Sequence, residues 1–252
     1  CALPIYRIML SKSQIKLVKS LKHKKYRNIY NLFIVEGLKG ILEAKKSNFT
    51  IEKIIITEEV YYKYKNQLSK TKIIIASENQ INSISTLKNN FTGLAILKMK
   101  SYHLDHINFK DLILAIDSIK DPGNFGAIIR IADWYNIKNI VCSNDTVDVY
   151  NPKVVQSSMG SFLRVKTIYT DLSNFLNKSN YDIIGTSVNG DNIRNFSRID
   201  KGIIVLGNES NGISKEVSKY IDKWISIKKY GNAESLNVAI SSAIILDNIR
   251  NS

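Results

Sequence analysis

Two stretches near the end of the chain carry the residues best suited to hold a ligand. The first, IIVLGNESNGIS at 203–214, reads as a buried strand that breaks at Gly207 into a polar loop closing at Gly212. The second, AESLNVAISSAIILDNIR at 233–250, reads as an apolar helix capped by Ser235. A Gly/Asn loop after a strand places backbone N–H groups and small side chains where open α/β sheets bind ligands. We therefore expect a ligand site there, with the last helix buried against it.

A second loop of this kind lies earlier, in AIDSIKDPGNFGAIIRIADW at 115–134. Pro122 and Gly123 predict a turn, and Asn124 is placed to cap the helix that follows. Arg130 falls two turns into that helix, which begins at the edge where ligands bind. A fixed cation near that edge suits an anionic ligand group.

Several other chemistries lack their motifs. The glycines around Asn124 do not have the dinucleotide-binding spacing, and Ile213 stands where a phosphate-binding loop needs lysine. The sequence contains no H-x-x-x-H, no C-x-x-C and no nucleophile elbow. The three histidines, His23, His103 and His106, all precede the C-terminal domain. We therefore expect no metal and no histidine acid–base chemistry in the site.

Strand-like and helix-like segments alternate along the chain. Residues 9–100 hold four apolar strand-like runs separated by helical patterns, which predicts a compact α/β or α+β domain. Residues 101–110 lose apolar periodicity and form the predicted linker. From 111 to 252 short apolar strands alternate with helices more cleanly. This pattern predicts a parallel sheet covered by helices on both faces.

The positive charge is concentrated in the N-terminal part. Residues 1–100 hold 19 Lys+Arg against 6 Asp+Glu, a net of +13, whereas residues 101–252 hold 17 against 16, a net of +1. Ser11 and Gln14 predict a capping box that opens a helix displaying part of this charge. An unbalanced cluster of this kind indicates contact with the phosphates of a nucleic acid. The residues predicted to contact these phosphates are Lys12, Lys16, Lys19, Lys22, Lys24, Lys25 and Arg27.

The sequence also indicates where the protein works. No apolar run reaches the roughly 18–20 residues of a membrane span. The first ten residues lack a signal cleavage site, and we interpret residues 1–8 as an extension. Cys1 and Cys142 have no disulfide or zinc spacing. We expect a cytoplasmic protein that does not associate with membranes.

Three segments together resemble a known family. DPGNFGAIIRIA (121–132), IVLGNESNGIS (204–214) and AESLNVAISSAI (233–244) resemble, in order and spacing, the motifs of the SpoU/TrmH group of RNA ribose 2′-O-methyltransferases, within the SPOUT superfamily. SSMGSFLRV (157–165) is similar to the family segment between the first two motifs. FIVEG and its helix (33–46) look like the family's N-terminal substrate-binding domain. The resemblance covers almost the whole chain.

The resemblance implies a C-terminal SPOUT domain tied into a trefoil knot, S-adenosylmethionine as cofactor, and a homodimer with the site near its interface. The cofactor residues that it implies are Thr186, Gly207, Asn208, Glu209, Gly212, Ile227, Leu236, Asn237 and Val238. The catalytic residues that it implies are Asn124, Arg130, Glu209, Ser235 and Asn237.

The implied reaction is methyl transfer to a ribose 2′-hydroxyl of structured RNA. An arginine stays protonated, so Arg130 would grip a phosphate rather than act as a base. Ribosomal RNA is favoured by the two-domain form, and transfer RNA is the alternative substrate. One departure leaves a further alternative open. The family usually has Ile-Pro-Met before its last motif, whereas here Lys228 and Lys229 follow Ile227. A non-catalytic RNA-binding protein that keeps the fold is that alternative.

Overall fold

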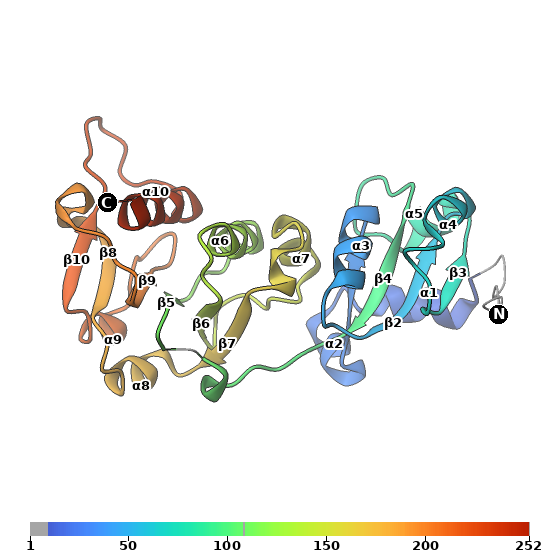
Figure 1. The fold of residues 1–252 in the computed structure, drawn as a ribbon, viewed down its shortest axis with the longest axis horizontal. Coiled ribbons are helices and arrows are strands. Elements are labelled where there is room, and N and C mark those ends of the chain that lie inside the picture. The colour runs from blue at the N-terminus through green and yellow to red at the C-terminus, as the bar shows by residue number, and fades with distance from the viewer. Residues whose placement is uncertain (1–9, 108, 252) are drawn as a thin grey trace. The chain divides into compact units, whose positions relative to one another are not determined.

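The chain divides into two compact units, each built on its own sheet (Figure 1). The structure is a computed structural model that describes residues 10–107 and 109–251. The first unit contains the described residues up to Lys100 together with Tyr150–Leu163. The second contains the described residues of Ser101–Val149 and those from Arg164 onward. The predicted extension at residues 1–8 lies outside the described residues.

The first unit has a mixed four-stranded sheet in the order β1-β4-β2-β3. Strand β4 pairs antiparallel with both β1 and β2, and β2 pairs parallel with β3. The first unit thus combines helices with a mixed sheet, as either predicted class would. Its strands are β1 (Leu32–Glu36), β2 (Ile51–Ile56), β3 (Ile73–Ile75) and β4 (Gly93–Lys98). Its helices are α1 (Lys12–Ser20), α2 (Lys24–Tyr30), α3 (Leu38–Lys46), α4 (Glu58–Tyr64), α5 (Glu78–Ile84), α7 (Pro152–Ser157) and the 3₁₀ turn η2 (Ser161–Leu163).

Helix α1 begins with the predicted capping box. The Gln14 amide N–H donates to Ser11 Oγ over 3.2 Å, and the Ser11 N–H donates to Gln14 Oε1 over 2.9 Å. These two bonds satisfy backbone donors that the first helical turn leaves without partners. Val18 is buried, while the lysine side chains on the opposite faces stay exposed.

Aromatic side chains attach residues 150–163 to the first unit. The ring of Phe33 on β1 lies 4.4 Å from that of Tyr150 and 5.7 Å from that of Phe162, measured between centroids. Phe49 lies 6.0 Å from Phe162. The Tyr150 hydroxyl accepts from the N–H of Lys100 and donates to its carbonyl. This attachment was not predicted, and the boundaries 9–100, 101–110 and 111–252 stay a prediction.

The second unit has a six-stranded sheet in the order β10-β8-β9-β5-β6-β7, and every neighbouring pair is parallel. The prediction of a parallel sheet is thus confirmed. Its strands are β5 (Leu112–Ile116), β6 (Asn139–Ser143), β7 (Lys166–Thr170), β8 (Ile183–Asn192), β9 (Gly202–Leu206) and β10 (Lys223–Ser226). Its helices are α6 (Pro122–Trp134), α8 (Leu172–Asn177), α9 (Lys215–Ser218), α10 (Val238–Asn251) and the 3₁₀ turns η1 (Leu104–His106) and η3 (Ile193–Asn195).

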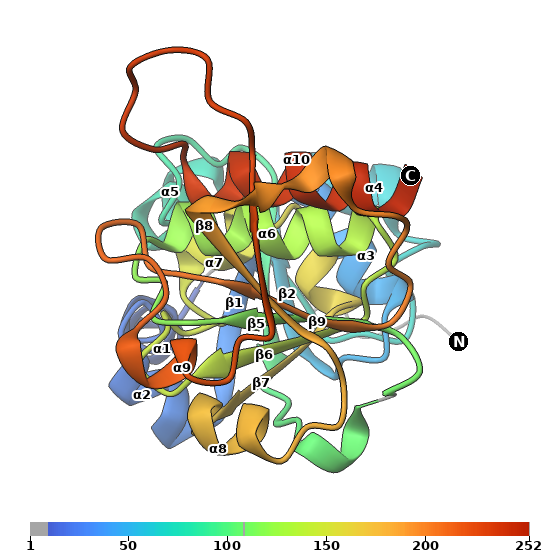
Figure 2. The same ribbon diagram turned by 90° about the vertical axis from the view of Figure 1, so that its left-hand side faces the viewer.

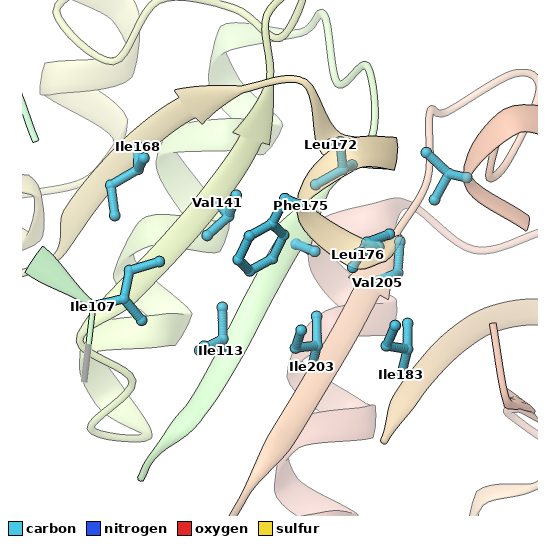
Figure 3. Close-up of a cluster of buried hydrophobic side chains, with 12 residues drawn as sticks. Ile107, Ile113, Val141, Ile168, Leu172, Phe175, Leu176, Ile183, Ile203 and Val205 are labelled. Carbon is cyan, nitrogen blue, oxygen red and sulfur yellow. The ribbon is translucent and has the colours of Figure 1, made fainter. Parts of the chain in front are cut away.

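Helices cover this sheet on both sides, as predicted. Figure 2 shows α6 and α10 on one side and α8 and α9 on the other. On the α8 side, Phe175 points into a group of branched side chains from the strands, among them Ile113, Val141 and Ile203 (Figure 3). Strand residues that point to opposite faces are all buried, because both faces are covered. This core fixes the strand ends from which the site loops begin.

Helix α10 is held by partners distant in sequence. Tyr135, just after α6, donates its hydroxyl to Asp247 over 3.1 Å. The Ile199 N–H donates to the Ile249 carbonyl, and Arg250 donates to Asp200 over 3.0 Å. The expected burial of this helix is therefore confirmed on one face, which includes Leu246. No described helix is long and apolar enough to cross a membrane.

Candidate active site

The loop after β9 is closed by its own backbone. The Asn208 N–H donates to the Gly212 carbonyl over 2.9 Å, and the Gly212 N–H donates back to Asn208 over 3.0 Å. Gly212 has a φ of 66°, which glycine adopts without strain. A Cβ on Gly207 would stand 2.2 Å from the Gly212 carbonyl carbon. Gly207 therefore has no room for a side chain, and the predicted closure at Gly212 is confirmed.

Helix α6 does not begin at the predicted cap. Its N-cap is Asp121, whose Oδ1 accepts the Asn124 N–H over 2.8 Å. The prediction that Asn124 caps this helix is wrong, because Pro122 is well suited to the first helical position and shifts the cap to the residue before it. Asn124 stands in the first turn, and its side chain is free to reach other loops.

Helix α10 also has a different cap from the predicted one. Asn237 Oδ1 accepts the N–H groups of Ala239 and Ile240 over 2.9 and 3.3 Å. The prediction that Ser235 caps the helix is therefore wrong: Ser235 lies in the exposed loop that precedes it. The helix starts two residues later because an asparagine amide satisfies its free N–H groups as well as a serine would.

Asn124 and the actual cap of α10, Asn237, meet in a chain of side-chain hydrogen bonds. Asn237 Nδ2 donates to Asn124 Oδ1 over 2.8 Å, and Asn124 Nδ2 donates to Glu209 Oε1 over 2.9 Å. The chain joins the loop after β9, the start of α6 and the start of α10. Each amide has its donor and acceptor ends fixed by its neighbours. Three predicted catalytic residues are thus brought into direct contact.

A further bond ties the loop after β9 to the loop after β5. Asn208 Nδ2 donates to the Ser118 carbonyl over 2.7 Å. Ser118 has a φ of 60°, a left-handed conformation that is uncommon for serine. Its N–H donates to Ser143 Oγ over 2.9 Å, so both of its backbone polar groups have partners. Such local strain persists only where the surroundings hold it in place.

Sequence reasoning missed a polar network beside this chain. Asp145 accepts from Ser118 and Ser143 over 2.7 Å each and from Lys120 Nζ over 2.5 Å. Partial burial alone would raise the pKa of Asp145, but these hydrogen bonds and the Lys120 charge hold that pKa well below its usual range. The network fixes the loop that leads into α6. Polar residues directly after adjacent strands were the signal that could have revealed it.

A cleft of about 240 Å³ opens beside the same network. Asp117 is buried at its base, and Asp117 Oδ2 accepts the Ser214 N–H over 2.7 Å. The cleft lies at the carboxyl ends of β5, β6 and β7, where parallel sheets commonly bind ligands. Its lining residues are Asp117, Ser143, Asn144, Thr170, Asp171, Leu172, Ser173, Ser214 and Val217.

The other predicted cofactor residues lie on or after the strands β8, β9 and β10 and at the start of α10. Thr186 on β8 donates its hydroxyl to the Val205 carbonyl of β9 over 3.0 Å. Gly207 directly follows β9, and Ile227 directly follows β10. Leu236 is about half exposed, and Val238 opens α10. Gly207 and Ile227 therefore lie at the carboxyl edge of the sheet, whereas Thr186 lies within β8.

Arg130 lies on α6 with its side chain exposed. Among the salt bridges of the described residues, none involves Arg130, so its charge is not neutralised within this part of the chain. An exposed guanidinium on the helix that carries Asn124 is suited to bind an anion. Within the described part of the chain, no group of three His, Cys, Asp or Glu side chains could hold a metal ion.

The predicted RNA-binding cations differ in exposure. Lys12, Lys16 and Lys19 are exposed on α1, and Lys24 and Lys25 are exposed on α2. The other two are occupied within the protein. Lys22 Nζ donates to the Ser85 carbonyl over 2.9 Å.

Arg27 needs a correction as a predicted RNA-binding residue. It is only 2% exposed, and its Nη1 donates to the carbonyls of Leu21 and Lys22 over 3.0 and 2.9 Å. A guanidinium buried in this way cannot contact a phosphate directly. It satisfies the carbonyls where α1 ends, so its role is structural.

Comparisons with known proteins cover both units. The SpoU rRNA Methylase family matches residues 111–247, and the MRM3-like substrate binding domain matches residues 12–94. A Bacillus subtilis protein named 23S rRNA (guanosine(2553)-2′-O)-methyltransferase RlmP is 26% identical over 94% of this chain and 96% of its own. The Neisseria meningitidis 23S rRNA (guanosine-2′-O-)-methyltransferase RlmB is 27% identical over 77% and 81%.

A solved structure agrees with the fold. The AdoMet-bound rRNA methyltransferase from Sinorhizobium meliloti superposes with a TM-score of 0.87, covers 97% of each chain and is 24% identical. At that identity the likeness concerns the fold alone. The family match extends over more than half of the chain and includes all three motifs that meet in the Glu209–Asn124–Asn237 chain. The protein belongs to the SpoU rRNA methylase family.

Proposed function

We propose that this protein transfers a methyl group from S-adenosylmethionine to a ribose 2′-hydroxyl of ribosomal RNA. The observation that carries the proposal is the hydrogen-bonded chain of Glu209, Asn124 and Asn237. It joins three loops that are far apart in sequence at the carboxyl edge of a parallel sheet, where such sheets bind ligands. Relatives that span nearly the same length are named as 23S rRNA 2′-O-methyltransferases.

The residues along this edge fit the cofactor's chemistry. An adenosine with a charged amino-acid tail needs backbone polar groups, small residues and some apolar surface. The loop from Gly207 to Gly212 supplies the first two, and Ile227 and Leu236 supply apolar side chains that are not buried in the core. We assign the cofactor wall to Thr186, Gly207, Asn208, Glu209, Gly212, Ile227, Leu236, Asn237 and Val238.

The cofactor supplies an activated methyl group on a sulfonium, so the protein's task is to position the hydroxyl and assist its proton. Positioning alone contributes roughly 7–11 kcal/mol in well-oriented reactions. Arg130 grips the neighbouring phosphate and stabilises negative charge that develops on the ribose oxygen. Glu209 has acceptor capacity beyond its bond to Asn124, which a ribose hydroxyl can use.

Asn124 and Asn237 keep that acceptor in place. Because Asn237 is fixed as the cap of α10, its amide orients Asn124, and Asn124 in turn orients Glu209. A carboxylate held from one side points its remaining lone pairs in a defined direction. Ser235, in the loop before α10, reaches the substrate only when that loop lies against the site, and we retain it as a catalytic candidate on the resemblance alone.

Three finer features belong to the same proposal. The C-terminal segment that includes α10 forms a trefoil knot, the protein acts as a homodimer with the site near its interface, and it works in the cytoplasm. Two hydrogen bonds that hold α10 in place support the knot. The Tyr135 hydroxyl donates to Asp247, and Arg250 donates to Asp200. The free thiol of the buried Cys142 is compatible with a reducing compartment.

The division of labour is also part of the proposal: residues 9–100 bind RNA, 101–110 form a linker and 111–252 carry out methyl transfer. Its support is the location of the charge, +13 in residues 1–100 against +1 in the rest.

The test is methylation with radiolabelled S-adenosylmethionine of ribosomal RNA and of transfer RNA transcripts, with mapping of 2′-O-methyl sites. We expect a labelled ribosomal RNA nucleotide and no label when that nucleotide is 2′-deoxy. If only transfer RNA is labelled, transfer RNA and not ribosomal RNA is the substrate. No cofactor binding in calorimetry would favour the non-catalytic RNA-binding alternative.

A further inference from the structure

Helix α2 exposes an aromatic surface that none of the residues described by the structure covers. Tyr26, Ile29 and Tyr30 are 38%, 60% and 48% exposed. The rings of Tyr26 and Tyr30, one helical turn apart, lie parallel within 17° with centroids 6.3 Å apart. His23 at the helix cap packs edge-on against Tyr26. Three large side chains thus form one exposed face, which we call the α2 aromatic face.

The helix is held firmly although this face is free. Buried Arg27, three residues before Tyr30 on α2, bonds the carbonyls of Leu21 and Lys22 where α1 ends. Asn31 closes the helix in the left-handed conformation, with a φ of 53°. The α2 aromatic face is therefore presented on a supported helix, which lowers the entropy lost when a ligand binds.

The stretch of sequence that contains α2 carries only positively charged side chains. No Asp or Glu precedes Glu36, whereas residues 1–35 contain eight Lys or Arg. Lys25 lies four residues before Ile29 and is therefore its neighbour on the helix surface. Lys24 and Lys25 are both exposed, and neither is in a salt bridge within the described part of the chain. A ligand for this surface should combine flat apolar faces with negative charge.

We propose that the α2 aromatic face binds unpaired nucleotides of the RNA substrate, with bases stacked on Tyr26 and Tyr30 and phosphates near Lys25. Single-stranded RNA offers both components at once, because its bases can be splayed out onto aromatic rings. A duplex hides its base faces and would use only the lysines. This inference rests on the proposed function and names the form of RNA that the first unit recognises.

The test measures binding of the full-length protein to a fluorescein-labelled 12-nucleotide oligouridine and to an RNA duplex of equal length. We expect the single strand to bind more tightly at equal salt. Tyr26→Ala and Tyr30→Ala should each weaken oligouridine binding at least about 5-fold. Tyr26→Phe and Tyr30→Phe keep the ring and should bind as wild type. Tyr62→Ala, at another exposed tyrosine of the same unit, is the matched control.

The salt dependence of RNA affinity distinguishes base stacking from contacts between lysines and phosphates. The tyrosine variants should lower affinity with no change in the log–log salt slope. Lys25→Ala should instead reduce that slope by about 0.7 for the phosphate that is no longer neutralised. Calorimetry with S-adenosylmethionine on the same variants should be unchanged, so a failure here is distinguishable from failure of the proposed function.

Two results would overturn the proposal. One is equal oligouridine affinity in wild type and both alanine variants. The other is a change in self-association on sedimentation of the tyrosine variants without a change in RNA affinity, which would make the face a protein contact instead.

Discussion

Asn237 Nδ2 donates to Asn124 Oδ1 across 2.8 Å, and this bond joins the first turns of two helices 113 positions apart in the chain. Asn237 does so while its own Oδ1 caps α10. Asn124 passes the constraint on to Glu209 over 2.9 Å. One amide thus couples the start of the last helix to the orientation of a carboxylate on another loop.

Asn124→Ala should lower the single-turnover rate of methyl transfer by about 100-fold or more, because it removes both the acceptor for Asn237 and the donor to Glu209. Cofactor binding should change little. Asn124→Asp should be no better, since it places a second carboxylate against Glu209. Asn177→Ala, exposed at the end of α8, should match wild type. A wild-type rate in Asn124→Ala would show that the hydrogen-bonded chain has no catalytic role.

Gly207→Val should abolish S-adenosylmethionine binding, measured by calorimetry. The new Cβ would stand 2.2 Å from the carbonyl carbon of Gly212, and backbone cannot yield as a flexible side chain can. The loop must therefore open. Gly231→Ala is the control, because a Cβ there meets no atom within 4 Å. Undiminished affinity in Gly207→Val would place the cofactor elsewhere.

Substitutions of Arg130 test whether this residue holds a phosphate or acts as a general base. Arg130→Lys should keep part of the activity with a rate that does not rise with pH, since a lysine point charge replaces the guanidinium fork incompletely. Arg130→Ala should lose nearly all methyl transfer and still bind cofactor. Single-turnover rates across pH for the three proteins decide the matter. A rate in the lysine variant that climbs as lysine deprotonates at alkaline pH would indicate a base.

Arg27→Ala should destabilise the first unit by about 1–3 kcal/mol, because the buried carbonyl of Leu21 and the part-buried carbonyl of Lys22 lose their donor. Lys25→Ala, on the exposed side of the same helix, should stay within about 0.5 kcal/mol of wild type. Guanidinium chloride unfolding gives both values. In RNA binding the order is reversed: Lys25→Ala should reduce the log–log salt slope of the affinity, whereas Arg27→Ala should leave that slope unchanged. Equal stability of the two proteins would refute the structural role of Arg27.

Asp145 should make the free energy of unfolding depend on pH in the acidic range. Its pKa lies below the usual range in the folded protein, so the folded state binds fewer protons there than the unfolded state. The stabilisation is complete above the unfolded pKa of about 3.9 and is lost as pH falls below it. Asp145→Asn should thus be less stable than wild type at pH 7, with the gap closing below about pH 4. Thermal unfolding across pH measures this, and a gap independent of pH would contradict it.

Local patterns in the sequence predicted much of this molecule. The capping box of Ser11 and Gln14 is correct because both partners lie within one helical turn. The parallel sheet of the second unit followed from short apolar strands alternating with helices, since strands buried on both faces must be apolar throughout. The loop closing at Gly212 was likewise visible in its own residues.

The caps of α6 and α10 are Asp121 and Asn237 rather than the predicted Asn124 and Ser235. Pro122 in the first helical position already favours Asp121 locally, whereas the bond from Asn237 to Asn124 exists only in the folded protein. Packing also buried Arg27, which looked like one more surface cation.

The same holds for residues 150–163, which join the first unit because the rings of Tyr150 and Phe162 meet Phe33. Such contacts depend on which surfaces meet after folding. The sequence by itself therefore determined the elements and the motifs, whereas the pairing of Asn124 with Glu209 and Asn237 arose only when strands distant in the chain brought their ends to one edge.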